Sequence, residues 1–187
     1  MGYIIVVDAS VARAAGESGK PEPSACRATL LAMLAHNYKV AMSVSLRGEW
    51  MKPRPDTHSP YATAFALRWL TQMQNQRRVI DITSSPDSEA LRNRCIAALD
   101  QNPQTKTSAP AVAKDFHLVG IARQTDRRVV SLDRKIVTHL ALLKDSTPEI
   151  CPIMWLHPVQ HDAAEWLRNG GVEDEQYYVC RSVGPNE

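Results

Sequence analysis

The sequence predicts an α/β fold, a three-layer α/β/α sandwich in which helices cover both faces of a central parallel sheet. The chain opens with the apolar run Ile4-Ile5-Val6-Val7, which is typical of a central strand covered on both faces. Short strand-like segments then alternate with amphipathic segments, and this alternation indicates parallel strands joined by helical crossovers. With 44% hydrophobic and 22% charged residues over 187 positions, the composition is that of one globular unit.

In the first half of the chain, the sequence predicts two strands and two helices, and each helix has a recognisable start. The first strand covers residues 3–7, and a helix over 24–36 follows, with Ser24 as its N-cap. Apolar and smaller side chains alternate over 40–46, which predicts a second strand ending just before Glu49. Ser59-Pro60 has the form of a capping residue followed by a first-turn proline, so a helix is expected from there to residue 76.

The second half repeats the alternation of strands and helices. Ser85-Pro86 predicts another helix start after a short strand over 79–82, and the polar stretch 100–108 predicts a loop. The remaining expected elements are a helix from Asp115 to residue 124, strands over 128–132 and 153–156, helices over 134–143 and 162–168, and an edge strand over 177–179.

Four acidic residues occupy positions that solubility alone does not explain. Asp8 and Asp133 directly follow apolar strands, Glu49 follows a third strand by a few residues, and Asp115 lies on the helix that leads to the strand before Asp133. Ligands bind at the carboxyl ends of the strands in open α/β sheets, and clustered carboxylates there favour a divalent cation. Each acid also has a simpler interpretation. Asp8 and Asp133 would be helix caps, Glu49 would pair with Arg47 or Lys52, and Asp115 would pair with Lys114 or Arg123.

Taken together, these segments resemble the PIN-domain family of metal-dependent nucleases over residues 3–156. The resemblance rests on Ile4-Ile5-Val6-Val7-Asp8-Ala9-Ser10, on Ser45-Leu46-Arg47-Gly48-Glu49-Trp50 and on two later segments. The later pair is the more specific: Asp115-Phe116-His117-Leu118 on a helix, followed by a strand ending Ser131-Leu132-Asp133. It implies a PIN-like nuclease domain over 1–156, with 157–187 as a C-terminal extension packed on it or trailing from it.

The family binds one or two Mg²⁺ or Mn²⁺ ions and cuts phosphodiester bonds, mostly in RNA. Carried over by position, the resemblance makes Asp8, Glu49, Asp115 and Asp133 the metal-binding catalytic acids. It makes Ser10 and Ser131 supporting hydroxyls that orient a carboxylate or a water. Many small members are toxins of toxin–antitoxin pairs, so an antitoxin protein is an expected partner beside the RNA substrate, and a homodimer is expected because dimers are common in similar proteins.

Two alternative functions follow from the same residues. A catalytically silent nucleic-acid-binding or assembly module would keep the fold without using the acids. A phosphatase with Asp8 as covalent nucleophile would need a second acid two residues later, where Ser10 stands. Five cations near the acids are candidate contacts to nucleic-acid phosphates, with solvated surface charges as the simpler interpretation: Arg13, Lys52, Arg54, Arg134 and Lys135.

The remaining features predict a reduced cytoplasmic protein. No apolar stretch is long enough to cross a bilayer, and a secretory signal pattern is missing. The cysteines at 26, 95, 151 and 180 have no CxxC spacing, so free thiols are expected. His157 and His161 are expected to be structural because Pro158 interrupts a helix between them. The tryptophans are expected in the core, with Trp50 beside Glu49 the one to test as a base-stacking platform.

Overall fold

The computed structural model describes residues 2–55 and 58–181. Five parallel strands form one sheet in the order β3-β2-β1-β4-β5. Their bounds are β1 Ile4–Val7, β2 Lys39–Met42, β3 Val79–Asp81, β4 Arg128–Val130 and β5 Met154–Leu156. Because β1 is followed in sequence by β2 on one side and is paired with β4 on the other, the strand order reverses between β1 and β4. That reversal is where ligands bind in open α/β sheets.

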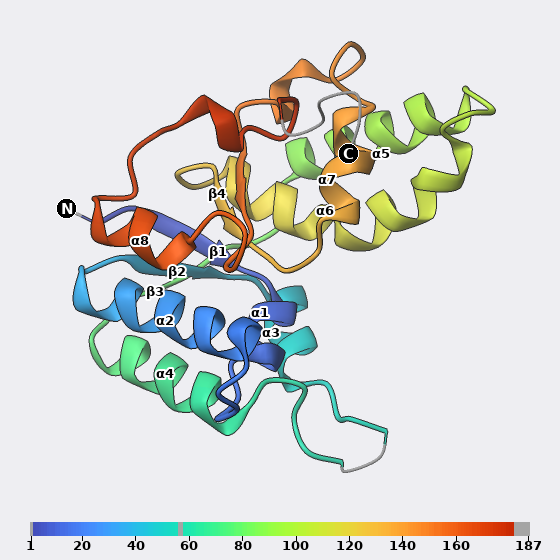
Figure 1. Ribbon diagram of the computed structural model, residues 1–187. Coiled ribbons are helices and arrows are strands. Elements are labelled where there is room, and N and C mark those ends of the chain that lie inside the picture. The colour runs from blue at the N-terminus through green and yellow to red at the C-terminus, as the bar shows by residue number, and fades with distance from the viewer. Residues whose placement is uncertain (1, 56–57, 182–187) are drawn as a thin grey trace.

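Helices cover both faces of this sheet, which confirms the predicted three-layer α/β/α sandwich (Figure 1). On one face lie α2 Pro21–Ala35, α4 Ala64–Asn75 and α8 Ala163–Arg168, and on the other lie α5 Pro86–Asp100, α6 Ala109–Arg123 and α7 Lys135–Ala141. Two helices sit at the carboxyl edge of the strands, α1 Ala9–Ala14 and α3 Val44–Met51. Short 3₁₀ turns complete the described chain at Lys106–Ser108, Pro148–Ile150 and Glu175–Tyr177.

The second strand is shorter than the sequence predicts. Strand β2 ends at Met42, and the chain then turns into α3 because the Ser43 hydroxyl accepts a hydrogen bond from Leu46 N at 3.1 Å. A side-chain cap of this kind gives the backbone donors of a first helical turn a partner that a strand ladder does not offer. The prediction of a strand over 40–46 was therefore wrong in its second half, and Glu49 lies on a helix.

Helix boundaries follow the predicted caps in one case and depart from them in two. Ser85 caps α5 as predicted, accepting from Ser88 N. Helix α4 begins after Thr63, whose hydroxyl accepts from Ala66 N, so the Ser59-Pro60 start was wrong; Pro60 lies in an antiparallel bridge instead. Ser24 lies inside α2. The predicted edge strand over 177–179 is a single antiparallel bridge between Met154 and Tyr178, next to a 3₁₀ turn.

The C-terminal segment is attached to the sheet by a disulfide that the sequence did not predict. Cys151 and Cys180 are bonded, whereas Cys26 and Cys95 are free and buried, so the expectation of four free thiols was wrong for the first pair. The backbone explains the pairing: Val179 N donates to Ile153 O at 2.9 Å, which brings Cys180 next to the turn before β5 that contains Cys151. Within residues 2–55 and 58–181, no helix combines the length and apolar character that a membrane span requires.

Reducing this disulfide is expected to lower the free energy of unfolding by about 3 kcal/mol, because the bond closes a loop between residues 29 apart in sequence. Denaturant unfolding of the oxidised and the reduced protein measures the difference. A Cys151→Ser/Cys180→Ser variant should match the reduced protein and respond no further to reductant. Equal midpoints for oxidised and reduced protein would show that the bond contributes nothing to stability.

Candidate active site

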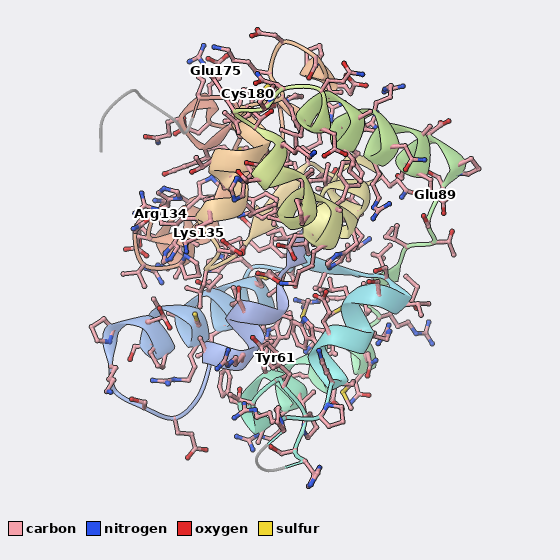
Figure 2. All side chains as sticks on the ribbon, turned by 90° about the vertical axis from the view of Figure 1, so that its right-hand side faces the viewer. Tyr61, Glu89, Arg134, Lys135, Glu175 and Cys180 are labelled. Carbon is pink, nitrogen blue, oxygen red and sulfur yellow. A yellow bond between two sulfur atoms is a disulfide. The ribbon has the colours of Figure 1, made fainter. Side chains whose placement is uncertain are left out.

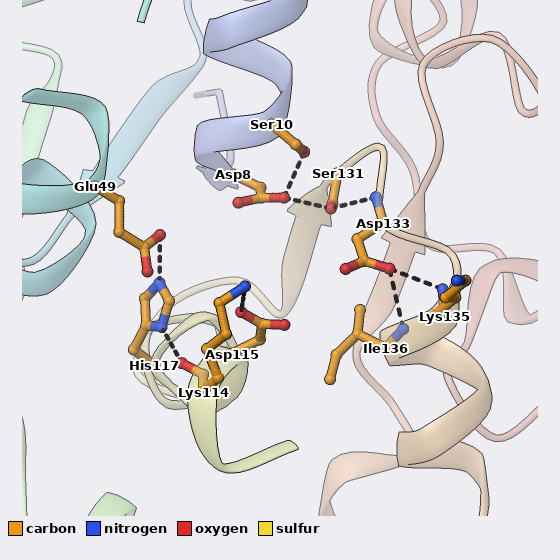
Figure 3. A network of polar contacts seen from close by, with 10 residues as sticks. All are labelled: Asp8, Ser10, Glu49, Lys114, Asp115, His117, Ser131, Asp133, Lys135 and Ile136. Atoms are coloured by element: carbon orange, nitrogen blue, oxygen red, sulfur yellow. Dashed lines mark hydrogen bonds and ion pairs between the residues drawn. The ribbon is translucent and has the colours of Figure 1, made fainter. Parts of the chain in front are cut away.

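The candidate active site lies at the carboxyl ends of β1 and β4, where the strand order reverses. Asp8 follows β1 directly and its backbone N–H donates to Val130 O at 3.0 Å, which continues the pairing between the two strands past Val7. Asp133 follows β4 after two intervening residues. Asp115 and Glu49 reach the same edge from α6 and α3, so all four predicted acids meet there (Figure 3).

Asp8 is held by two serine hydroxyls rather than serving as a helix cap. It occupies the N-cap position of α1, but its carboxylate makes no capping hydrogen bond within the described chain. Ser10 Oγ and Ser131 Oγ both donate to Asp8 Oδ2, at 2.5 and 2.6 Å. Asp8 is only 9% exposed, so these two bonds fix the orientation of a nearly buried carboxylate. The cap interpretation of Asp8 is therefore wrong.

Asp133 combines a capping role with a place in the site. Its Oδ1 accepts from Lys135 N at 2.9 Å and from Ile136 N at 3.3 Å, as a residue that starts a helical turn does. Its own N–H donates to Ser131 Oγ at 3.0 Å. Ser131 therefore bridges Asp8 and Asp133 while being 1% exposed, and it sets the two carboxylates relative to each other.

The pKa of Asp115 is shifted by its burial and by the charged groups around it. Burial raises the pKa of this carboxyl, Lys114 lowers it, and the charges of Asp8 and Asp133 raise it further, so that its pKa lies above the ordinary value. Lys114 Nζ is 3.6 Å from Asp115 Oδ1, and the pKa of Lys114 is raised chiefly by that acid. The pKa of Asp115 is raised in spite of this ion pair because burial is the larger effect, and the Lys114 side chain is 76% exposed to water, which screens its charge.

Glu49 contacts His117 instead of the predicted Arg47 or Lys52. His117 Nε2 lies 3.3 Å from Glu49 Oε2, close enough for an ion pair although not aligned as a hydrogen bond. Burial lowers the pKa of His117, but the contact with Glu49, the Lys114 carbonyl and the charge of Asp8 outweigh it and raise that pKa above its ordinary value. Arg47 pairs with Asp81, outside the site.

The four acids line one cavity of about 280 Å³, which we call the acidic cavity, together with Ser10, Lys52, Tyr61 and Lys114. Carboxylates and hydroxyls are the hard oxygen donors that Mg²⁺ and Mn²⁺ prefer. Among the described residues, however, no three acidic, histidine or cysteine side chains stand as a group that could hold a metal ion. Both hydrogen bonds to Asp8 end on Oδ2, so its second oxygen remains available to a ligand in the cavity.

The donor chemistry of the acidic cavity fits a hydrated divalent cation. Mg²⁺ keeps several waters and needs only one or two direct carboxylates, so a tight cage of three acids is not required. Two of the four acids have a basic partner already, Asp115 in Lys114 and Glu49 in His117. Lys114 is mostly exposed and can leave Asp115 when another positive charge arrives.

Only one of the five predicted basic contacts lines the acidic cavity, namely Lys52. Arg13 lies over the Tyr61 ring, with its Cζ 4.9 Å from the ring centroid, and Arg54 donates to the Tyr61 carbonyl at 2.9 Å. Arg134 and Lys135 line a neighbouring cavity instead, and Figure 2 shows them side by side. Lys114 pairs with Asp115, as the simpler interpretation of that acid expected, and it also lines the acidic cavity. The sequence did not indicate Tyr61 as a cavity residue or His117 as the partner of Glu49.

His157 and His161 each accept a backbone hydrogen bond in the turn after β5, through Nδ1, which agrees with the structural role predicted for them. Burial lowers the pKa of both rings, and the charge of Arg134 lowers it further, below the ordinary 6.5. When folding lowers the pKa of a histidine, protonating it costs more free energy in the folded than in the unfolded protein. The stability of the fold therefore falls as the pH drops below the pKa of the unfolded state. We therefore expect stability to fall as the pH drops below 6.5, measured by denaturant unfolding from pH 7.5 to 5. A His157→Gln/His161→Gln variant should show a flatter pH profile; an unchanged slope would contradict this assignment.

Comparison with known proteins adds no family assignment: no family model matches the sequence, and no match appears among curated proteins.

Proposed function

We propose that the protein is a divalent-metal-dependent ribonuclease of the PIN type, which hydrolyses phosphodiester bonds of single-stranded or structured RNA. The observation that carries the proposal is the meeting of Asp8, Glu49, Asp115 and Asp133 around one cavity at the reversal of the strand order. Four clustered carboxylates repel a phosphate group. A cation bound between them and the phosphate would remove that repulsion.

In this proposal Asp8 and Asp133 are the main holders of Mg²⁺ or Mn²⁺, because both are fixed through Ser131. Glu49 and Asp115 complete the site and are positioned by His117 and by their helices. When bound, the cation would make water a better nucleophile at neutral pH and offset charge on the phosphate. Ser10 and Ser131 act on Asp8 by fixing which of its oxygens faces the cavity.

The strand would be held by residues around the acids. Lys52 and Lys114 line the acidic cavity with side chains that can contact backbone phosphates. Tyr61 offers the aromatic ring in that cavity, and Arg13 donates to its hydroxyl at 3.0 Å. A stacked base and a neighbouring guanidinium are a common arrangement for single-stranded nucleic acid. An antitoxin protein and a homodimer remain predicted partners.

A second candidate function is a nucleic-acid-binding module without catalysis. Two ion pairs favour it: Lys114 with Asp115, and His117 with Glu49. Lys114, and His117 when it is protonated, lower the negative charge around two of the four acids without any metal, which a silent module would need in order to approach phosphates. The two candidates differ in what a divalent cation does to the protein.

The experiment that separates them measures RNA binding and RNA cleavage on the same preparation, with Mn²⁺, with Mg²⁺ and with EDTA. The ribonuclease predicts cleavage that requires the cation and direct binding of Mn²⁺ seen by electron paramagnetic resonance. The silent module predicts RNA binding that is the same with and without the cation, and no cleavage. Absence of both binding and cleavage on mixed-sequence RNA would contradict both candidates for such a substrate.

A further inference from the structure

A second cavity of about 300 Å³ adjoins the acidic cavity and has the opposite chemical character. The two share Asp133, and the second is lined further by side chains that mainly donate hydrogen bonds or carry positive charge: Arg134, Lys135, Thr138, Trp155, His157 and His161. We call it the donor cavity. Figure 3 shows one of its lining residues, Lys135, next to Asp133. It is built from the turn after β4, from α7 and from the end of β5.

The indole of Trp155 is the first sign that this cavity takes a ligand. The other three tryptophans each give their Nε1–H to a backbone carbonyl: Trp50 to Val7, Trp69 to Leu30 and Trp166 to Val172. Trp155 is 2% exposed, and its Nε1 is buried with no hydrogen-bond partner among the described residues. A buried donor without an acceptor is costly, and buried indole N–H groups normally find one.

The two histidines add donors whose protons the structure fixes. His161 Nδ1 accepts from His157 N at 2.9 Å, and His157 Nδ1 accepts from Val159 N at 3.2 Å. A backbone N–H can only donate, so each neutral ring carries its proton on Nε2. Both rings therefore offer a donor at Nε2. Burial lowers the pKa of both rings; the positive charge of Arg134 lowers both further, and the neighbouring His157 also lowers that of His161.

On the shared wall, one oxygen of Asp133 and the Ser131 hydroxyl are engaged, and the second Asp133 oxygen lies on the side of Asp115 and the acidic cavity (Figure 3). Asp133 Oδ1 accepts from two backbone N–H groups, and Ser131 Oγ donates to Asp8 while accepting from Asp133 N. Among residues 2–55 and 58–181, the lining side chains with donors still to offer are the Trp155 indole, the two imidazoles, the Thr138 hydroxyl and the two cationic side chains. A ligand that matches them is rich in acceptor oxygens and negatively charged.

We propose that the donor cavity binds a phosphate group of the nucleic-acid strand, next to the phosphate at the acidic cavity. The strand part rests on the proposed function; the phosphate part rests on the donor set alone. Because the two cavities share Asp133, they would hold neighbouring phosphates of one strand. The acidic cavity would bind its phosphate through a cation, and the donor cavity would bind the next one through direct hydrogen bonds and positive charges. Arg134 and Lys135, predicted as phosphate contacts, would act here rather than at the acids.

The four indole N–H signals in a ¹H–¹⁵N correlation spectrum test this directly. The protein is titrated in EDTA with inorganic phosphate and, separately, with a short single-stranded RNA; sodium chloride at matched ionic strength is the control. We expect the Trp155 signal to move with both ligands and the other three to stay, because only Trp155 lacks an internal acceptor. Trp155→Phe identifies the signal. A Trp155 signal that moves no more with phosphate than with chloride would overturn the proposal.

A matched pair of charge variants checks that the ligand sits in this cavity. Arg134 lines the cavity and is exposed, and so is Lys144, which lies beyond α7 outside the cavity. We expect Arg134→Gln to weaken phosphate binding about tenfold and Lys144→Gln to leave it unchanged. Equal losses in both variants would mean general charge attraction and would overturn the site. Response to free phosphate without response to RNA would overturn the strand assignment. None of these readouts requires cleavage, so they stand apart from the nuclease proposal.

Discussion

An Asp8→Asn variant is expected to lose metal-dependent RNA cleavage by about 100-fold or more while keeping its fold. Asp8 is the acid fixed by two serine hydroxyls at the reversal of the strand order, and the amide keeps its shape and one oxygen but not its charge. Removing a residue that only orients a metal ligand typically costs about 10–100-fold, so loss of the ligand itself is expected to cost at least as much. Initial cleavage rates with Mn²⁺, at equal folded concentration, measure the effect.

Asp81→Asn provides the matched control for this variant. Asp81 also ends a strand of the sheet, β3, but its side chain is 76% exposed and pairs with Arg47 outside the acidic cavity. The same chemical change there should leave the cleavage rate at the level of the unmodified protein. If Asp8→Asn cuts as fast as Asp81→Asn, the activity comes from another site or from a contaminant, and the ribonuclease proposal fails.

The acids at the sheet edge were the part of the site that short-range sequence patterns could predict. Asp8 and Asp133 come after apolar runs short enough to be strands, and parallel strands bring their carboxyl ends to one edge whatever their order in the sheet. This property of parallel sheets was enough to predict that the two carboxylates lie close together, with no information on side-chain contacts. The order β3-β2-β1-β4-β5 itself carries no local signal, because it depends on which strands pair across long stretches of chain.

Glu49 was predicted at the correct edge of the sheet although the strand predicted before it was too long. The alternating run from Val40 to Leu46 fits a strand, yet Ser43 offers a helix cap within the same run, and the cap prevails. Periodicity alone does not separate a short strand from the first turn of a helix. The carboxylate still reaches the acidic cavity, because α3 starts at the carboxyl end of β2.

Contacts between distant segments were beyond the reach of the sequence. The meeting of His117 with Glu49 and the bond between Cys151 and Cys180 depend on how helices and the C-terminal segment pack. Residues two apart on a helix do not face each other, so His117 lies off the side of Asp115, and no pattern indicated the acid on another helix that it faces. The spacing of cysteines in a sequence likewise does not show which of them pair, unless they form a known motif.

A Trp50→Ala variant is expected to lower the free energy of unfolding by about 3–5 kcal/mol, the usual cost of removing a large buried aromatic side chain. Trp50 is fully buried, which confirms a core residue and excludes the base-stacking platform considered for it. Its Nε1–H donates to Val7 O at 3.3 Å, and its ring stacks near Trp69 with centroids 6.3 Å apart. The side chain therefore ties the helix that carries Glu49 to the strand that ends at Asp8.

Tyr61→Ala is the comparison that separates packing from RNA contact. Tyr61 lines the acidic cavity and is only partly buried, so its loss should cost little stability but weaken single-stranded RNA binding by about 1–3 kcal/mol if a base stacks on it. Trp50→Ala should do the reverse: a large shift of the denaturation midpoint and unchanged RNA affinity per folded molecule. Denaturant unfolding and fluorescence-anisotropy titration in EDTA measure the two quantities. RNA affinity lost in Trp50→Ala under conditions where it is fully folded would show that the tryptophan positions the RNA-binding surface as well as the core.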